Sequence, residues 1–278
     1  MRIVMPNMLA YRLLPFNLPG FPMQTVLITG CSSGYGLATA RHFHERGWRV
    51  VATLRDPASA ALIADERMQL LALDVTRDDS ITAAVDAAGP IDVLVNNAGI
   101  GLFGAFEATP LATVREVFDT NTFGVMAMAQ AVIPQFRARR TGRIINVTSS
   151  AVLAPMPLVA AYTASKTAIE GFTASLAHEL GAFDIEVKLV EPGYAPTTRF
   201  TANGQQRMAG LLPEPYQAYA QQVFAMLGDA GTYTQEADVA EAVWRAANDA
   251  TGQLHFPAGA DAVALADARG AQSLAPMG

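Results

Sequence analysis

The stretch VLITGCSSGYG, from Val26 to Gly36, decides the fold of this chain. Its first four residues are apolar or β-branched, as in a short buried strand, and glycines follow at positions 30, 34 and 36. Gly30 permits a tight turn, whereas Gly34 and Gly36 let the backbone approach a ligand and a helix approach the sheet. The N–H groups at the start of that helix would attract a pyrophosphate. The stretch therefore predicts a dinucleotide site at the end of a strand.

Strand-like and helix-like segments alternate along the chain on both sides of this stretch. The expected strands are residues 26–29, 49–54, 69–73, 91–95, 143–148 and 185–190, with a seventh strand and a closing turn in 253–270. The expected helices are 37–46, 57–66, 78–88, 111–137 and 160–183. This alternation predicts an α/β fold, a Rossmann-type doubly wound parallel sheet of about seven strands with helices on both faces. Ligands of such sheets bind beyond the carboxyl ends of the strands.

The composition fits one packed domain. Hydrophobic residues make up 51% of the 278 residues and charged residues 16%. The net charge of −6 offers no basic stripe for a phosphate backbone, so we expect no nucleic-acid partner. Cys31 is the single cysteine, which excludes an internal disulfide framework and fits a reducing, cytoplasmic compartment. No stretch approaches the ~20 apolar residues of a membrane span.

Residues 1–23 differ from the rest of the chain. Prolines at positions 6, 15, 19 and 22 interrupt any continuous helix. We expect an irregular N-terminal extension, followed by a single dinucleotide-binding catalytic domain over 24–278. A signal sequence or a membrane-touching arm is the alternative for the extension.

A second informative stretch, Ala161-Tyr162-Thr163-Ala164-Ser165-Lys166, opens a long apolar-periodic segment. On a helix, Tyr162 and Lys166 lie one turn apart on the same face. An ammonium at about 4 Å is worth about 4 kcal/mol in a partly buried site, and about 1.36 kcal/mol moves a pKa by one unit. We therefore expect Lys166 to bring the pKa of Tyr162 from near 10 towards neutrality, making Tyr162 a general acid or base. A tyrosine and a lysine on a helix surface is the alternative for this spacing alone.

The end of the second expected strand indicates which dinucleotide binds. Leu54 is followed by Arg55, where an NAD site usually has an acidic residue for the ribose 2′-hydroxyl. A guanidinium there would bind a 2′-phosphate, which predicts NADP(H). Asp56 is the opposing signal, because it could pair with Arg55 or contact the ribose, and NAD(H) stays the alternative.

Three motifs stand in order and register: the Gly30–Gly36 turn, Asn96-Asn97-Ala98-Gly99, and Tyr162-x-x-x-Lys166. Together they resemble the short-chain dehydrogenase/reductase family over about residues 25–198, with a turn and second-strand end similar to those of hydroxysteroid and retinol dehydrogenase-type members. The resemblance also marks Ser149 and Asn121, thirteen and forty-one residues before Tyr162. The implied catalytic tetrad is Asn121, Ser149, Tyr162 and Lys166. Ser150 is the rival to Ser149.

The resemblance also implies the cofactor contacts. Asp74 and Val75 resemble the pair that contacts adenine, and Pro192-Gly193 with Thr197 resembles the segment beside the nicotinamide. Tyr35 departs from the family, which usually has an aliphatic residue there. The expected contacts are Gly30, Ser32, Ser33, Gly34, Tyr35, Gly36, Arg55, Asp74, Val75, Asn97, Ala98, Gly99, Tyr162, Lys166, Pro192, Gly193 and Thr197.

As a family member, the protein would be an NADP(H)-dependent oxidoreductase acting on CH–OH or C=O. Apolar segments at 102–106 and 152–158, with a lid at about 198–235, predict a small hydrophobic ketone, aldehyde or alcohol as substrate. The alternatives are an NAD(H)-dependent alcohol dehydrogenase of the same family and a non-catalytic nucleotide-binding regulator. The family commonly forms homodimers or homotetramers, and we expect one here. We expect no metal site, because the four histidines are scattered and no carboxylate completes a ligand set.

Overall fold

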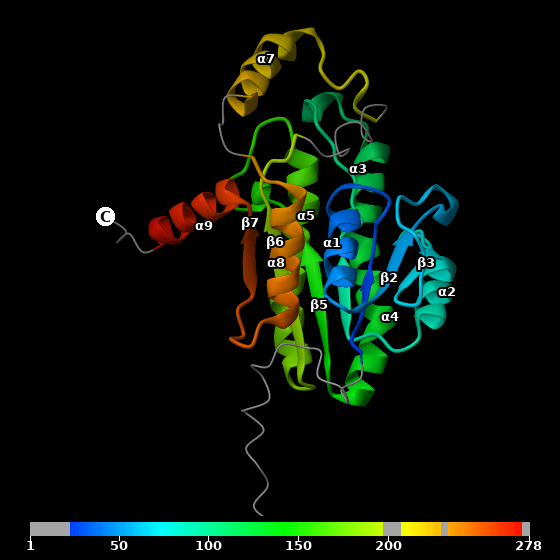
Figure 1. Ribbon diagram of the computed structural model, residues 1–278. Coiled ribbons are helices and arrows are strands. Elements are labelled where there is room, and N and C mark those ends of the chain that lie inside the picture. The colour runs from blue at the N-terminus through cyan, green and yellow to red at the C-terminus, as the bar shows by residue number, and fades with distance from the viewer. Residues whose placement is uncertain (1–22, 197–206, 229–232, 274–278) are drawn as a thin grey trace, which may run out of the picture.

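The computed structural model describes residues 23–196, 207–228 and 233–273 (Figure 1). Within these ranges seven parallel strands form one sheet in the order β3-β2-β1-β4-β5-β6-β7. The strands are β1 (Thr25–Ile28), β2 (Arg49–Leu54), β3 (Met68–Ala72), β4 (Val93–Asn96), β5 (Gly142–Val147), β6 (Ile185–Pro192) and β7 (His255–Ala258). The predicted Rossmann-type sheet is confirmed. The expected extension over 1–23 lies outside the described residues, except for Met23, and so does part of the expected lid.

Helices cover both faces of the sheet (Figure 1). On one face α1 (Gly34–Glu45) and α8 (Glu236–Asn248) pack side by side, and on the other lie α2 (Asp78–Ala88), α4 (Gly124–Arg139) and α5 (Ala160–Gly181). The other described helices are α3 (Leu111–Phe118), α7 (Glu214–Gly228) and α9 (Ala260–Ser273). No helix in the described part of the chain is both long and apolar enough to cross a membrane.

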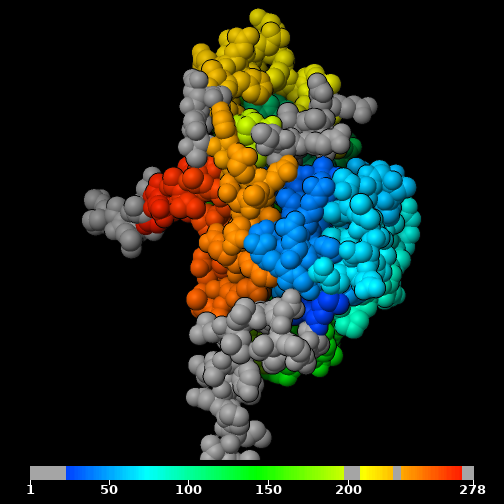
Figure 2. Space-filling model, viewed as in Figure 1, coloured from blue at the N-terminus to red at the C-terminus, as the bar shows by residue number. Residues whose placement is uncertain are grey.

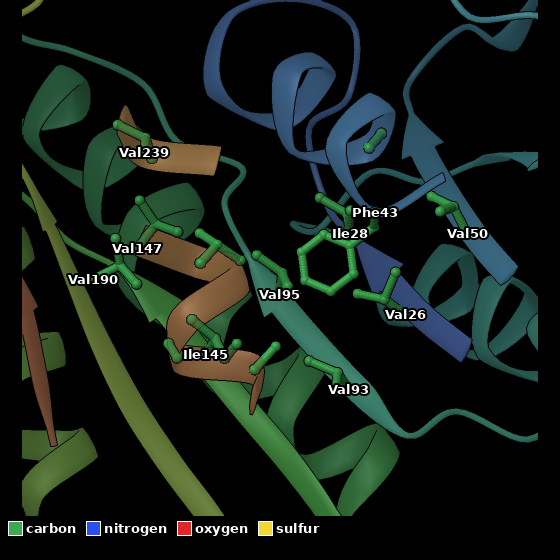
Figure 3. Packing of buried hydrophobic residues seen from close by; sticks show 14 of the residues in the cluster. Val26, Ile28, Phe43, Val50, Val93, Val95, Ile145, Val147, Val190 and Val239 are labelled. Atoms are coloured by element: carbon green, nitrogen blue, oxygen red, sulfur yellow. The ribbon is translucent and has the colours of Figure 1, made fainter. Parts of the chain in front are cut away.

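The packing of α1 on the sheet fixes where the glycine turn lies. Phe43 of α1 is fully buried against Val26 and Ile28 of β1 and Val50 of β2 (Figure 3). Its ring also meets Trp244 of α8 edge-on, with centroids 5.0 Å apart. Burying such a ring contributes roughly 1.5–3 kcal/mol. Because α1 is held in this way, the turn that precedes it stays at the carboxyl end of β1.

The helix predicted over 57–66 is wrong. Only a single 3₁₀ turn forms there, η2 (Pro57–Ser59). Asp56 caps this turn, since its Oδ1 accepts a hydrogen bond from the Ala58 N–H at 3.1 Å. Ala60 then returns to an extended conformation, with ψ at 136°, so the turn cannot propagate.

The helix predicted as continuous over 111–137 is interrupted. A π-helical turn, η4 (Asp119–Phe123), separates α3 from α4. π-Turns insert an extra residue into a helix and are frequent at functional sites. Here the turn carries Asn121, which is fully buried.

The end of the chain is also more helical than predicted. β7 is present, but α9 follows it instead of a closing turn. The prediction also missed α8, although Gln235 and Asp238 form a capping box at its start and Val239 and Val243 have helical spacing.

A buried ionic cluster links β6 to the loop that precedes β7. Lys188 of β6 is 2% exposed, and its Nζ lies 2.8 Å from Asp249 Oδ2 and 2.9 Å from Glu186 Oε2. Asp249 also accepts hydrogen bonds from the backbone N–H groups of Thr251, Gly252 and Gln253, which shape the loop before β7. Burial alone would raise the pKa of Asp249, but the hydrogen bonds from Lys188 and Thr251 outweigh it and hold the pKa well below its usual range.

We predict that Asp249→Asn lowers the free energy of unfolding by roughly 1.5–3 kcal/mol, because it removes one of the two carboxylates that pair with the buried ammonium of Lys188. Because the folded-state pKa is depressed, the wild-type stabilisation is complete above the ordinary carboxyl pKa of 3.8 and is lost as the pH falls below it. Urea unfolding at pH 7 and pH 3 measures both effects. The control is Asp86→Asn on α2, where the side chain is exposed. Equal losses in the two variants would contradict the prediction.

Candidate active site

A cavity of about 470 Å³ opens at the carboxyl ends of the central strands. α7, in yellow at the top of Figure 2, stands beyond one end of the sheet (Figure 1). Predicted residues that line it are Gly30, Ser32, Ser33, Gly34, Tyr35, Arg55, Asp74, Val75, Asn97, Ala98, Gly99, Tyr162 and Lys166. Predicted residues outside this lining are Gly36, Asn121, Ser149, Pro192 and Gly193. Thr197 lies outside the described residues.

The glycine turn is held by a second turn after β4. Gly30 has a φ of +76°, a conformation that favours glycine. Asn97 Nδ2 donates hydrogen bonds to Thr29 O at 2.9 Å and Gly30 O at 3.3 Å. A Cβ on Gly36 would lie 2.3 Å from Gly30 O and 2.5 Å from Asn97 Nδ2. Because no side chain fits at this position, glycine at position 36 lets the start of α1 pack closely against the turn.

The start of α1 fits a phosphate group. Ser33 is the N-cap residue but makes no side-chain capping hydrogen bond, and no acidic residue stands in the first turn. The first N–H groups of a helix lack intrahelical partners and carry partial positive charge. Together with the glycine turn, they form a cradle that suits a dinucleotide pyrophosphate.

The far end of the cavity carries the residue predicted to select the nucleotide. Arg55 is exposed there and lines the cavity beside Asp74 and Val75. Asp56 is absent from the lining, and its carboxylate caps the following turn. Asp74 accepts hydrogen bonds from Thr76 Oγ1 at 2.7 Å and Thr76 N at 3.0 Å, which lower the pKa of Asp74.

Three of the four predicted catalytic side chains meet at the other end. The Tyr162 hydroxyl on α5 is hydrogen-bonded to Ser149, which follows β5. Ser149, and not its rival Ser150, is therefore the serine bonded to the tyrosine. Ser149 Oγ also accepts a hydrogen bond from Ala151 N at 3.2 Å. Lys166 is 5% exposed, and its Nζ donates to Val147 O at 2.9 Å.

The predicted effect of Lys166 on Tyr162 is wrong for the protein alone. Burial raises the pKa of Tyr162 to about 12, and the hydrogen bond with Ser149 opposes this only in part. Burial also lowers the pKa of Lys166 to about 8, with Glu170 acting in the opposite direction. The ammonium is directed to the Val147 carbonyl, and desolvation dominates both groups.

Asn121 lies behind this group of side chains. Its Oδ1 accepts from Ile100 N at 2.8 Å, and its Nδ2 donates to Ile100 O at 2.9 Å and to Ser165 Oγ at 3.2 Å. A Cβ on Gly99 would lie 3.3 Å from Asn121 Oδ1 and 3.5 Å from Lys166 Nζ. Asn121 therefore ties the loop after β4 to α5.

The segment after β6 is held by Asp261 of α9. Asp261 Oδ2 accepts from Tyr194 N at 2.7 Å and would collide with a Cβ on Gly193. Tyr35 lies near both Asp261 and Tyr162, and burial raises the pKa of Tyr35, with the negative charge of Asp261 acting in the same direction. The departure at Tyr35 thus adds a second phenol next to the first.

Several lining residues were not predicted. Thr148 and Ile100 line the cavity, and each lies after a strand. Their positions beyond the carboxyl ends of strands could have predicted them as lining residues. Glu116 and Arg207 carried no such signal, because a contact between segments 91 residues apart joins them, with Arg207 Nε 3.5 Å from Glu116 Oε2.

The expectation that no carboxylate completes a ligand set around a histidine does not hold for His255, which lies with Glu170 and Glu191. His255 Nδ1 lies 2.7 Å from Glu191 Oε1 and 3.9 Å from Glu170 Oε2. In addition, His42 pairs with Glu241 and His44 with Asp65. These carboxylates come from elements distant in sequence, so spacing along the chain did not reveal them.

Comparison with known proteins agrees with this geometry. The sequence profile of the short chain dehydrogenase family matches residues 24–208, and the chain belongs to that family. Retinol dehydrogenase 8 of Homo sapiens is 42% identical over 181 residues, which are 61% of this chain and 58% of the relative. The 3-ketodihydrosphingosine reductase of Bacteroides thetaiotaomicron is 42% identical over 187 residues, 65% of this chain and 66% of the relative. The match thus spans about 58% of the length of the retinol dehydrogenase.

Solved structures share the whole fold. A short-chain dehydrogenase from Streptomyces avermitilis is 30% identical with a TM-score of 0.78, covering 91% of this chain and 94% of that one. A Brucella melitensis 3-ketoacyl-(acyl-carrier-protein) reductase with NADH is 28% identical, with a TM-score of 0.71 over 84% and 96% of the two chains. A Burkholderia cenocepacia short chain dehydrogenase with NADP is 25% identical, with a TM-score of 0.71 over 91% and 98%. Members of the family thus bind either nucleotide.

We predict that Gly36→Ala destabilises the turn, because the added Cβ meets backbone that cannot move aside. The cost is roughly 1–3 kcal/mol, the usual range for overpacking. Gly171→Ala on α5 is the matched control, since nothing lies within 4 Å of its Cβ. Urea unfolding and NADPH titration should show losses for Gly36→Ala only. A Gly36→Ala protein as stable and as tightly binding as the control would contradict this account of the turn.

Proposed function

We propose that the protein is an NADP(H)-dependent oxidoreductase that interconverts a hydrophobic ketone or aldehyde and the corresponding alcohol. The observation that carries the proposal is the hydrogen-bonded pair of Ser149 and Tyr162, because Tyr162 and the buried Lys166 both line the cavity that the glycine turn also borders. A bound nicotinamide would supply the hydride. The side chains of the protein then have to bind the substrate oxygen and provide its proton.

In the proposed reaction the carbonyl oxygen lies between the hydroxyls of Ser149 and Tyr162. Both hydroxyls stabilise the negative charge that develops on this oxygen as hydride reaches the carbon. Tyr162 gives its proton to the oxygen, and the reverse steps oxidise the alcohol. Burial raises the pKa of Tyr162, so its hydroxyl carries the proton before the reaction begins. Lys166 is proposed to bind the nicotinamide ribose, and Asn121 to hold a water molecule that relays protons.

Apolar surroundings support a hydrophobic substrate. Leu102, Val117, Ala161 and Leu211 form a buried cluster against which Tyr162 packs. Phe103 stacks on Phe224 of α7, with ring centroids 4.8 Å apart. The names of the two similar enzymes, a retinol dehydrogenase and a ketodihydrosphingosine reductase, also denote substrates with long apolar portions. We extend this chemistry to the present chain as part of the proposal.

The location and the assembly of the enzyme are also part of the proposal, and each is supported by one feature. The single cysteine, Cys31, is buried as a free thiol, and this supports a location in the reducing cytoplasm. The expected homodimer or homotetramer is supported by Leu111 and Phe123, large apolar side chains on the α3–α4 segment that are 61% and 58% exposed. We also propose that 24–278 form one domain.

We predict that Tyr162→Phe lowers kcat/KM for reduction of a hydrophobic ketone by roughly 100-fold or more, the usual contribution of a general acid. NADPH absorbance measures the rate, and a titration should give NADPH binding close to that of the wild type. Ser149→Ala should also lose activity, whereas Ser150→Ala is the matched control and should keep it. Undiminished turnover in Tyr162→Phe would refute the assigned acid. A wild-type protein that turns over no carbonyl with either nucleotide would favour the non-catalytic regulator.

We predict that Arg55→Ala raises the Kd for NADPH by about ten-fold or more, because a charge-assisted hydrogen bond to the 2′-phosphate is lost. The Kd for NADH should hardly change, since NADH has no such phosphate. Arg245→Ala on α8 is the control, because it removes the same charge from an exposed site. A wild-type preference for NADH, or equal effects of Arg55→Ala on both nucleotides, would support the NAD(H) alternative.

A further inference from the structure

Glu170 lies one helical turn beyond Lys166 on the same face of α5. The two side chains are bound by consecutive residues at the end of β5. Lys166 Nζ donates to Val147 O at 2.9 Å, and Glu170 Oε1 accepts from Thr148 Oγ1 at 2.6 Å. The ammonium and the carboxylate are therefore held at the same corner of the sheet.

Burial makes the charge of Lys166 depend on its neighbours. Desolvation disfavours an ammonium and lowers the pKa of Lys166 to about 8, close to physiological pH. The charge of Glu170 acts against burial and raises this pKa. Without that carboxylate, Lys166 would be neutral over more of the physiological range.

Charged groups from three other elements face Glu170. The largest effect on Glu170 is burial, which raises its pKa, while the hydrogen bond from Thr148 opposes this. Glu191 of β6, which is 1% exposed, raises the pKa of Glu170 further, whereas His255 of β7 and Arg269 of α9 lower it. His255 is 54% exposed, and its hydrogen bond with Glu191 raises its own pKa.

The donor set Glu170, Glu191 and His255 also has the composition of a metal site, with one ligand atom from each within 4.8 Å of the others. A cation is the less favourable occupant. His255 Nδ1 already lies at hydrogen-bond distance from Glu191, and the positive charge of Arg269 acts on Glu170. The two carboxylates are thus balanced by cationic side chains of the protein.

We propose that Glu170 is a positioning residue of the active site, and that its carboxylate, anchored by Thr148, keeps the ammonium of Lys166 protonated. The effect on turnover rests on the proposed function, since a neutral lysine would lose the charge with which Lys166 is proposed to bind the nicotinamide ribose. The effect of Glu170 on the protonation of Lys166 does not depend on the proposed function.

The sequence offers a direct test, because Lys166 and Lys188 are the two lysines of the whole chain. Full-length protein carrying ¹³C-lysine should therefore give two sets of lysine side-chain signals in NMR spectra, and Lys166→Met assigns them. Lys188 is paired with Asp249 and serves as an internal reference. We expect Lys166 to titrate with a midpoint of about 8 in the wild type and at lower pH in Glu170→Gln. Glu170→Asp keeps the charge and should stay near the wild type.

The matched control is Glu179→Gln, which removes the same charge from an exposed position of α5. A pH profile of NADPH-dependent ketone reduction gives a second readout. In Glu170→Gln the alkaline loss of kcat/KM should move to lower pH, with roughly a five-fold drop at pH 8 relative to pH 6, as expected on losing one nearby opposite charge. Damage to the structure alone would lower kcat/KM equally at every pH.

An unchanged Lys166 midpoint in Glu170→Gln, or a midpoint moved as far in Glu179→Gln, would overturn the proposal. If the wild type reduces no carbonyl, the proposed function fails, while the lysine titration still decides the role of Glu170.

Discussion

A buried ammonium at the end of β5 is the feature on which the active site depends. Removing such a charge from water costs several kcal/mol, so the protein must offset it with well-placed partners. Lys166 has the Val147 carbonyl as a hydrogen-bond acceptor and Glu170 as a counter-charge. These partners fix α5 against the strand end. Tyr162, one turn before Lys166, is then placed beside Ser149, which leaves the same strand.

The same strand edge explains how the rest of the cavity is assembled. β1 lies between β2 and β4, so the chain segments leaving these three strands surround one opening. The glycine turn follows β1, Arg55 follows β2, and Asn97 follows β4. Asn97 donates hydrogen bonds to the carbonyls of the glycine turn and so joins two of these segments. A long cofactor could therefore lie from Arg55 to Tyr162 across the sheet edge.

Much of this arrangement could be predicted from the sequence, because it depends on local signals. Short apolar strands, positions that require glycine and the spacing of Tyr162 and Lys166 are properties of neighbouring residues. The errors arose where burial or contacts that the sequence pattern does not show decide the outcome. The segment after Pro57 forms a single 3₁₀ turn and then becomes extended at Ala60, and the π-turn at Asn121 is bonded to Ile100 and Ser165. The pKa of Tyr162 was mispredicted because burial, which the sequence does not reveal, raises it, and the hydrogen bond with Ser149 opposes this only in part.

We propose that Ser149 and Tyr162 hold the oxygen of a carbonyl whose carbon receives hydride from the nicotinamide. The most direct test is reduction of a hydrophobic ketone with NADPH deuterated at nicotinamide C4, in each of its two stereoisomers, followed by mass and NMR analysis of the alcohol. The account predicts one deuterium on the carbinol carbon from one stereoisomer only. Alcohol that carries no deuterium from either stereoisomer, or no alcohol at all across a panel of hydrophobic ketones and aldehydes, would contradict it.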